Sequence, residues 1–442
     1  MSAGFVSQAK ATRVGLGFRD LPWATIVGHP GVQTTEQVRD NFREHTLTEV
    51  IDNLTTSMAA QGGGEREPDP RDVVFRGGLT ELNEYFIERE WSDGLPVVPP
   101  TRERIEAFLA HTRRSPDEVL GVLLPDNRVA TVWNVAVNGV MAGCRPEYMP
   151  LLVSMIDAMC DPGYGNEHSG NTPGGDTLVI LNGPVIQKLG FNYTQGVMRD
   201  GFQPNTSVGR FWRLYLRNVA GFLPHKTDKG CFGNTWRVVI AENDEVVRRI
   251  GWQPLSVDMG LGPDDSTVTI ARYTGGGMVT SMSGNTPEKL LPYLADSIVN
   301  QTHWQISFTM GAAFGTLRPL ALITPIVAET IAACGWSKDD VKRFLFEQCR
   351  IPAWQFERML RDWKDHAIWN LAEQVAAGNM PRELYGTSDD PNRLVPIVWA
   401  PEHIMLVVTG DPLRNHGYTF GHNGRLGFPT TKKIDLQSSG AG

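Results

Sequence analysis

The chain has 442 residues, of which 41% are hydrophobic and 20% charged, and its formal net charge is -8. This length predicts two or three domains, each with a sizeable core. The acidic balance argues against a nucleic-acid-binding surface, which would be basic. No apolar run approaches the roughly 20 residues that cross a bilayer, so we expect a cytoplasmic protein. The 5 cysteines are odd in number and scattered, which favours reduced thiols over a disulfide framework.

The first part of the chain predicts one short strand between two helices. The helical patterns cover residues 5–17 and 35–58, and the strand covers 23–27. One strand cannot bury a sheet by itself. We therefore expect residues 1–60 to be a partial α/β segment that another chain or domain completes. A glycine-rich, charged run with prolines follows and predicts a linker at 61–78.

Helices dominate the next stretch. They are expected over 80–91, from Thr101, from Ser115, over 131–141 and from Pro146 to about 160. The helix at Ser115 is expected from a capping box, Ser115-Pro116-Asp117-Glu118. Residues 92–100 form an extended connector, because each residue before a proline is pushed out of the helical region.

The break before Pro146 holds the best placed thiol of the chain, Cys144, followed by Arg145. A helix N-terminus stabilises anions and lowers the pKa of a thiol. Cys144 is therefore a candidate nucleophile, and Arg145 is a candidate ligand for an anionic substrate. The alternative for Cys144 is a small buried hydrophobic residue, which is the commoner fate of a free cysteine.

Residues 205–244 combine a helix, a polar loop and a strand. The helix is expected to begin at Thr206 or Ser207, to end at Ala220 and to carry an arginine stripe. Its arginines, Arg210, Arg213 and Arg217, could hold a carboxylate or phosphate, although such a stripe is most often a solvated face.

The loop after this helix supplies more candidates. His225 could transfer protons, Lys229 could bind an anion, and Cys231 lies in an electropositive setting that favours a thiolate. A plain surface turn is the alternative. The strand at 238–240 then ends in Glu242-Asn243-Asp244.

Polar residues also follow other expected strands. Ligands of α/β sheets gather at the carboxyl ends of strands. Asn182, Glu242 and Asn243 are therefore candidates, with Glu242 as a proton-transferring group and the two asparagines as substrate ligands. A helix cap or a structural hydrogen bond is the alternative for each.

The fold class indicated is α/β, with several strands alternating with helices in mostly parallel sheets. Further strands are expected at 267–271, 320–323 and 404–408, and further helices at 287–300, at 326–334, from Ser337 and over 354–376. We expect a central α/β domain at 79–315 and a C-terminal α/β domain at 316–442. No internal repeat is evident in the sequence.

A metal site is a second possibility. His168, His416 and His422 lie in glycine-rich stretches and could bind a metal together with Asp411. No His-Glu-x-x-His or paired cysteine motif supports this, so the cofactor stays unknown. The triple glycine at 275–277 could cradle an anion, but no P-loop, dinucleotide-binding fingerprint or Gly-x-Ser-x-Gly elbow is present. Nucleotide-dependent and serine-hydrolase chemistry are not expected.

Six separate motifs together resemble one bacterial family. They are WSDGLPVVPPT at 91–101, AVNGVMAGCRPEY at 136–148, SVGR at 207–210 with Asn218, AEN at 241–243, DSTVT at 265–269 and GWSKDDV at 335–341. In this order they resemble the proteins associated with the UGSC (seleno)proteins, and the resemblance covers most of residues 80–434. It implies Arg210 as the main candidate among the arginines for holding an anion, and Asn218 as a further substrate ligand.

The N-terminal segment is similar to the second half of the UGSC domain itself, through Leu21-Pro22 and Gly28-His29-Pro30. That domain is named for a Sec-Gly-Ser-Cys or Cys-Gly-Ser-Cys motif, which this chain lacks, and no cysteine precedes Cys144. The resemblance thus implies that a small partner subunit supplies the redox motif and that the protein is a hetero-oligomer.

Three functions remain open at this point. The first is an enzyme that makes or breaks a carbon-heteroatom bond of a small polar or anionic substrate by thiol-dependent, reductase-like or lyase-like chemistry. The second is a metal-dependent hydratase, lyase or hydrolase that uses the loop histidines. The third is a non-catalytic scaffold subunit of an enzyme complex.

Overall fold

The computed structural model describes residues 2, 6, 9, 10 and 13 and the ranges 21–28, 33–56, 69–125, 127–234, 236–309, 315–361 and 370–436. The helix expected at 5–17 lies mostly outside these residues. The helix expected at 35–58 is confirmed by α2 (Thr35–Asn41), η2 (Phe42–Thr46) and α3 (Leu47–Thr55). In place of the strand expected at 23–27, Ile26 forms an isolated bridge with Ser2.

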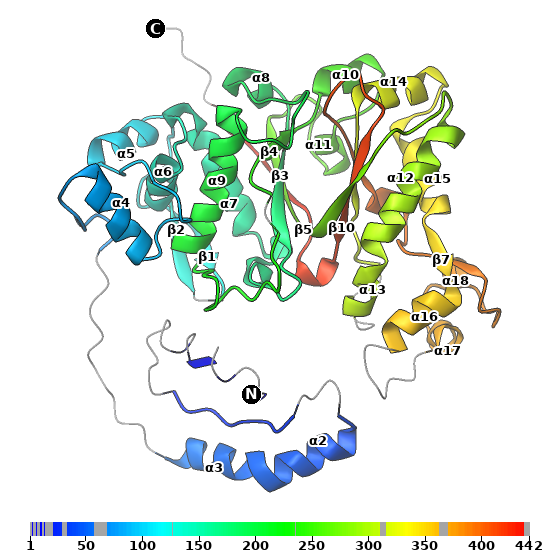
Figure 1. Ribbon diagram of the computed structural model, residues 1–442, viewed down its shortest axis with the longest axis horizontal. Helices are drawn as coiled ribbons and strands as arrows, with labels where there is room; N and C mark the ends of the chain where they lie inside the picture. The colour runs from blue at the N-terminus through cyan, green and yellow to red at the C-terminus, as the bar shows by residue number, and fades with distance from the viewer. Residues whose placement is uncertain are drawn as a thin grey trace.

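The N-terminal segment lies apart from the rest of the described chain in Figure 1. None of the buried hydrophobic clusters formed by the described residues contains a residue before Leu82. Along α3, Leu47, Ile51 and Leu54 recur at helical spacing, and all three are exposed. This helix therefore presents an apolar face that the described chain does not cover.

The main body is a curled sheet of seven strands (Figure 1). Its order is β4 (Val239–Ala241), β3 (Asp176–Asn182), β5 (Thr267–Val279), β10 (Gly417–His422), β6 (Leu320–Ile323) and β9 (Met405–Val408), and β11 (Thr430–Lys433) also pairs with β5. One sheet thus takes strands from both sides of the boundary expected at 315/316.

The expectation of mostly parallel sheets is wrong. Only β3 with β4 and β6 with β9 are parallel pairs, and the remaining pairs are antiparallel. Helical crossovers do link the parallel partners, as the alternation of strands and helices predicts. The next strand of each unit, β5 or β10, then returns on the other side of β3 or β6 in the opposite direction.

The sheet consists of two halves with the same connectivity. In the first half the chain runs from β3 to its parallel neighbour β4 and then to β5, which is antiparallel to β3. In the second half it runs from β6 to its parallel neighbour β9 and then to β10, which is antiparallel to β6. The strand order is therefore palindromic about the β5–β10 pair, an internal repeat that the sequence does not make evident.

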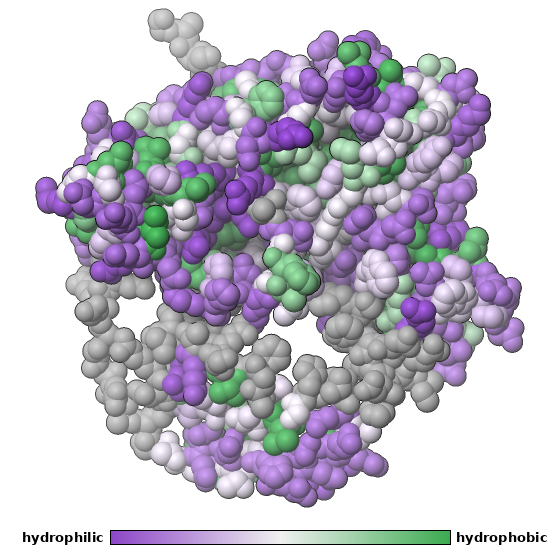
Figure 2. All heavy atoms as spheres, viewed as in Figure 1, coloured by the Kyte–Doolittle hydropathy of each residue, from purple (hydrophilic) through white to green (hydrophobic). Residues whose placement is uncertain are grey.

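Helices cover the outside of each half (Figure 1). The first half has α4 (Leu79–Glu88), α5 (Arg102–Leu109), α6 (Val132–Met141), α7 (Met149–Met159) and α9 (Gln203–Asn218); the second has α12 (Pro287–Thr302), α14 (Pro325–Ala333) and α15 (Lys338–Gln348). The helices expected over 80–91, from Thr101, over 131–141, over 287–300, at 326–334 and from Ser337 are confirmed. Figure 2 shows a patch of apolar side chains over the region of α4 and α5.

The core sits on both faces of the sheet because successive side chains of a strand point to opposite faces. In β3, Leu178 and Ile180 point into the curl, where they meet residues of β4, β5, β6, β9 and β10. Their neighbours Val179 and Leu181 point outward against the helices of the first half. This double burial explains why the strands are continuous apolar runs.

Smaller elements connect these parts. They are β1 (Val119–Leu123), β2 (Arg128–Thr131), η3 (Pro146–Tyr148), η4 (Pro162–Tyr164), η5 (Asn166–His168), α8 (Val185–Leu189), α10 (Asp244–Arg249), α11 (Leu255–Asp258), α13 (Trp304–Thr309), β7 (Arg350–Pro352), α16 (Ala353–Arg361), α17 (Leu371–Ala376), α18 (Arg382–Tyr385), β8 (Leu394–Pro396), η6 (Pro401–His403) and η7 (Gly424–Leu426). No helix of the described residues is long and apolar enough to cross a membrane.

Three local expectations are wrong. The capping box at Ser115 begins no helix, because the apolar run after Glu118 forms β1, which pairs with β2 as a hairpin. The helix α9 begins at Gln203, so Thr206 and Ser207 lie inside it rather than at its cap. The glycines at 275–277 lie inside β5, paired with β10, and do not form an anion-binding loop.

Candidate functional site

Polar residues close one end of the curl, at the carboxyl ends of four strands. Asn182 ends β3 and Thr324 follows β6, while Glu242 follows β4 and Thr409 follows β9. Each comes directly after an outward-pointing apolar residue, so the alternation of strands turns these side chains toward the interior. All four are buried. The second half thus carries threonines where the first half carries an amide and a carboxyl.

Glu242 ties three elements together at this end. Its Oε1 accepts a 3.1 Å hydrogen bond from the backbone N–H of Val408 on β9. Its Oε2 accepts bonds from the N–H of Leu255 on α11 at 2.8 Å and from Asn182 Nδ2 at 2.6 Å. The side chain is fully buried, so these donors replace the water that a carboxylate requires.

Asp244 stands beside Glu242 as a second carboxyl. Its Oδ1 accepts from Asn182 Nδ2 at 3.1 Å, and its Oδ2 accepts from the backbone N–H of Gly183. One amide group of Asn182 thus bridges the two carboxyls. The Oδ1 atom of Asn182 is buried without a hydrogen-bond partner, which is unusual for a buried polar atom.

A cavity of about 570 Å³ opens beside these carboxyls. It is lined by Gly183, Pro184, Ile186, Gln187, Tyr193, Glu242, Asp244, Glu245 and Arg248. The single guanidinium in this lining is already engaged: Arg248 Nη2 lies 3.0 Å from Asp264 Oδ1 and 2.9 Å from the carbonyl oxygen of Pro263. The cavity therefore favours neutral or cationic polar groups over anions.

The pKa of each carboxyl is raised. Burial raises the pKa of Glu242, and the nearby Asp244 adds to this, while the charge of Lys338 opposes it. Burial likewise raises the pKa of Asp244, against the hydrogen bonds from Gly183 and Asn182. Two neighbouring carboxyls with raised pKa values lose their protons in two coupled steps, so the pair can hold a single proton between those steps.

A buried ionic cluster lies behind the pair. Lys338 Nζ is 2.9 Å from Asp258 Oδ2 and donates a 3.0 Å bond to the carbonyl oxygen of Gln253. Lys342 Nζ lies 2.7 Å from the same Asp258 oxygen. Both lysines are buried, so two ammonium groups share one carboxylate there.

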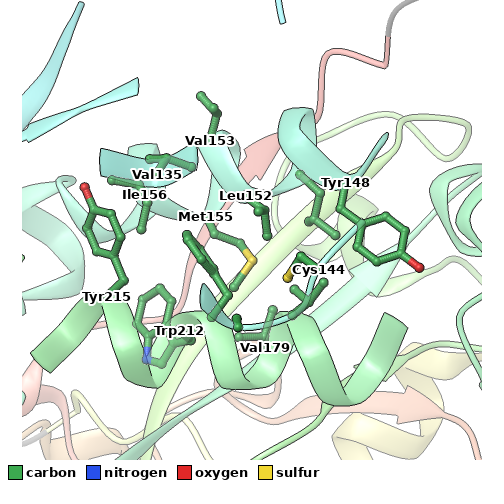
Figure 3. Packing of buried hydrophobic residues seen from close by; sticks show 14 of the residues in the cluster. Val135, Cys144, Tyr148, Leu152, Val153, Met155, Ile156, Val179, Trp212 and Tyr215 are labelled. Carbon is green, nitrogen blue, oxygen red and sulfur yellow. The ribbon is translucent and has the colours of Figure 1, made fainter. Parts of the chain in front are cut away.

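The expected thiol site forms a different cluster, at the junction of α6, α7 and α9. Figure 3 shows the Cys144 sulfur among apolar side chains that include Leu152 and Tyr148. Burial raises the pKa of the Cys144 thiol to about 12, against a hydrogen bond with Ser207 and the charge of Arg210. The thiol is thus protonated at neutral pH, which disfavours its use as a nucleophile.

Arg210 binds the connector at 92–100. Its Nε and Nη2 donate to Asp93 at 3.0 and 2.8 Å, and Nη2 also reaches the carbonyl oxygen of Pro96 at 2.9 Å. Such a bidentate pair satisfies the guanidinium. The structure therefore brings together two of the family-like motifs, those at 91–101 and 207–210, and gives Arg210 a structural partner.

The remaining substrate-binding candidates are not among the residues that line the cavity. Arg145 is exposed and 4.0 Å from Glu147, and Asn218 Nδ2 donates to Asn138 Oδ1 at 2.9 Å. Asn243 caps α10 by accepting from the N–H of Val246 at 3.1 Å, as its alternative interpretation predicts.

The loop candidates are also separate from the cavity. His225, Lys229 and Cys231 are exposed on turns after α9, and none of them lines the cavity. The backbone of this loop is held to the loop before β3, since the N–H of Cys231 donates to the carbonyl oxygen of Thr172 at 3.0 Å.

The histidines proposed as metal ligands have other partners. His422 is buried in β10, where Nδ1 accepts from the N–H of Arg318 at 3.0 Å and Nε2 lies 3.0 Å from the carbonyl oxygen of Gly427. Burial lowers its pKa to about 3. His416 Nδ1 accepts from the N–H of Ser281 at 3.0 Å. His168 lies beside Glu167 at 3.9 Å.

Asp411, the last proposed ligand, accepts from the N–H of Leu413 in a turn. Within the described ranges, no three His, Cys, Asp or Glu side chains are grouped so that they could hold a metal ion. The metal site expected from these four residues is therefore not assembled in this part of the chain.

Sequence reasoning selected Glu242 and Asn182 but missed Asp244, Lys338 and Asp258. Asp244 was visible as the third polar residue after the strand at 238–240. Lys338 belongs to the GWSKDDV motif, yet its approach to Glu242 depends on the meeting of the two halves, which no local pattern reveals.

Comparison of the chain with family models, curated proteins and solved structures finds no match. The class of protein that fold and site define is thus a mixed α/β protein with a buried carboxyl pair beside a cavity, and its function is argued from that geometry.

Proposed function

We propose that this protein is an enzyme that moves protons on a small polar substrate bound in the cavity beside Asp244 and Glu242. The observation that carries the proposal is the bridging of two buried carboxyls by one amide group, Asn182 Nδ2, at the wall of that cavity. Such an arrangement can supply one acid and one base from one pair. A lyase, hydratase or isomerase reaction uses both.

The number of protons on the Glu242–Asp244 pair is the same before and after the proposed reaction. The ionised carboxylate takes a proton from one atom of the substrate, and the protonated carboxyl gives a proton to another. In an isomerisation the two transfers restore the pair. In an elimination the donated proton leaves with a hydroxyl group as water, and the pair again keeps its proton count. Both carboxyls line the cavity where the substrate would bind, Asp244 partly exposed and Glu242 buried.

The cavity also supports a choice of substrate class. Its lining contains three carboxyl side chains and one arginine that is already paired with Asp264. A neutral polyhydroxyl compound or an amine fits this lining better than a phosphate or a simple carboxylate. Thiol attack by this chain is supported less, since Cys144 is buried with a raised pKa and Cys231 lies away from the cavity.

A partner subunit is a second part of the proposal, carried by a different observation. The exposed apolar face of α3, formed by Leu47, Ile51 and Leu54, is what an incomplete α/β unit leaves uncovered. A small subunit with a Cys-Gly-Ser-Cys-type motif, as the resemblance implies, would complete that unit and add the thiol. Native mass measurement after co-expression with neighbouring genes tests this, and a fully active lone chain would contradict it.

The proton-transfer proposal is tested by deuterium exchange. The full chain is incubated in D₂O with a panel of small polyols, hydroxy acids and amines, and proton NMR detects loss of C–H signals or formation of new products. Asp244→Asn should abolish any exchange found. Glu245→Gln is the matched control, because Glu245 lines the same cavity but makes no bond to Asn182. Exchange that survives Asp244→Asn would contradict the proposal.

A further inference from the structure

The candidate site is composite, because the two halves of the sheet meet at it. Glu242 and Asp244 come from the first half, whereas Val408, which donates to Glu242 at 3.1 Å, ends a strand of the second half. The N–H of Asn243 in turn donates to the carbonyl oxygen of Val408 at 2.7 Å. The β4 and β9 ends, which are the two edges of the sheet order, thus close the curl at the carboxyl pair.

The second half brings a buried charge to this junction. Lys338 opens α15 and is 5% exposed, and among the described residues its ammonium group pairs with one carboxylate, that of Asp258, which it shares with Lys342. The Oδ2 atom of Asp258 serves both Lys338 and Lys342, at 2.9 and 2.7 Å. Two buried positive charges against one negative charge leave an excess that a buried site does not tolerate without a further anion.

Among the described residues, two charged groups act on Glu242: Asp244 from α10 and Lys338 from α15. Lys338 Nζ donates a 3.0 Å bond to the carbonyl oxygen of Gln253, two residues before Leu255, whose N–H donates to Glu242 Oε2 at 2.8 Å. The strands β3 and β9 contribute the neutral Asn182 and Val408. Arg248 is about half exposed and engaged with Asp264, so the buried counter-charge that remains for Lys338 is one ionised carboxyl of the Glu242–Asp244 pair.

We propose that Lys338 is a positioning residue that keeps one negative charge, and therefore one proton, on the Glu242–Asp244 pair at neutral pH. Two ammonium groups, the carboxylate of Asp258 and a Glu242–Asp244 pair that holds one proton sum to zero charge. The pair is then one acid and one base before substrate arrives. This inference rests on the proposed function for its purpose, but the proton count of the pair is a property of the chain alone.

Infrared spectroscopy of the full chain in D₂O across about pH 5 to 9 tests this through the C=O stretching band of protonated carboxyls. Asp244→Asn and Glu242→Gln assign the band. The wild type should show one protonated carboxyl of the pair near neutral pH. Lys338→Met, which keeps the length of the side chain, should show two, with the titration midpoint of the pair raised by about 1 to 3 pH units.

Two further variants complete the design. Lys432→Met removes a lysine that pairs with Asp161 at 2.6 Å on the distant β11, and it should leave the band unchanged. Lys342→Met leaves Lys338 in place but gives it the whole of Asp258, so it should raise the midpoint by a smaller amount. If Lys338→Met does not fold, Lys342→Met serves as the test of the inference.

A wild-type proton count in folded Lys338→Met overturns the inference, as does an unchanged midpoint in Lys342→Met when the first variant does not fold. The deuterium-exchange screen is independent of this measurement. A failed screen with the expected infrared result would reject the proposed reaction and leave the role of Lys338 intact.

Discussion

The Oγ1 atom of Thr409 donates a hydrogen bond of 2.8 Å to the carbonyl oxygen of Ala241, across the place where the two edges of the curled sheet meet. This bond mirrors the one from Val408 N–H to Glu242 Oε1, with the two halves exchanging roles. These two hydrogen bonds join the ends of β4 and β9, although β4 and β9 are the first and last strands of the sheet order.

Replacing Thr409 by valine should destabilise the protein. The substitution keeps the shape but removes the hydroxyl, which also reaches the carbonyl oxygen of Tyr193 at 3.2 Å. Two buried carbonyls lose a donor, so we expect a loss of about 1 to 3 kcal/mol in the free energy of unfolding. Urea denaturation measures it. Thr409→Ser retains the hydroxyl and should lose less; equal losses would contradict the role of this bond.

The Asp93–Arg210 pair should make the free energy of unfolding depend on pH in the acid range. Burial opposes ionisation of Asp93, but the hydrogen bonds and charge of Arg210 outweigh it, so the pKa of Asp93 falls below its ordinary 3.8. A lowered carboxyl pKa gives stability that is present above the ordinary value and lost as pH falls through the lowered one. The stability gap between wild type and Asp93→Asn should therefore narrow below pH 3.8, as measured by denaturation at several pH values. A gap independent of pH would exclude the ion pair as its source.

Glu242 should make the stability of the protein depend on pH in the opposite direction to Asp93. Its pKa is raised by burial above the ordinary 4.5, so its contribution is full below that value and is lost as pH rises through the raised one. Glu242→Gln carries no such loss. Its free energy of unfolding relative to wild type should thus improve as the pH rises above the ordinary 4.5. The same series with Glu245→Gln should be flat, because Glu245 is exposed.

Alkylation should separate the cysteines into two groups. Cys231 and Cys334 are exposed, whereas Cys144 and Cys349 are buried. Burial raises the pKa of the Cys144 thiol to about 12, which leaves a thiolate fraction of about 10⁻⁴ at pH 8. Mass spectrometry after brief iodoacetamide treatment should find Cys231 and Cys334 labelled, and Cys144 labelled only after unfolding. Fast labelling of Cys144 in the native chain would restore it as a nucleophile.

Gly209→Ala in α9 should be strongly destabilising although alanine favours helices by about 1 kcal/mol. A Cβ atom at this position would lie 2.0 Å from the carbonyl oxygen of Arg237, which is backbone and cannot rotate away. Thermal unfolding measures the loss. Gly190→Ala is the control, since its Cβ meets open space and only its positive φ of 72° resists the change. A milder effect at Gly209 than at Gly190 would contradict the close packing of α9.

Local patterns predicted the elements better than their arrangement. The strand at 320–323 and the helix after Ser337 follow from an apolar run and a capping box, which depend on neighbours in sequence. The direction of a strand within a sheet does not depend on its neighbours in sequence. The return of β5 and β10 as antiparallel neighbours is decided by packing between segments far apart in the chain, so alternating strands and helices wrongly indicated parallel sheets.

The candidate site shows the same limit. Glu242 and Asn182 were found because each follows a buried strand, and their 2.6 Å contact agrees with that reasoning. Cys144 and Arg210 were chosen for a helix terminus and a charge stripe, but burial and Asp93 decide their chemistry. No residue pattern places Lys338 near Glu242, because that approach exists only once both halves have folded onto each other.

The palindromic strand order has an evolutionary consequence. Two identical ancestral chains, each with a parallel strand pair and one antiparallel return strand, would associate through their return strands about a two-fold axis. Each would present the same residues at the junction. Once the two copies are joined in one polypeptide, their sequences can diverge. One copy can then keep a carboxyl at Glu242, while the other has Thr409 at the equivalent position and contributes Lys338. A symmetric dimer cannot divide acid, base and counter-charge in this way, but a duplicated chain can.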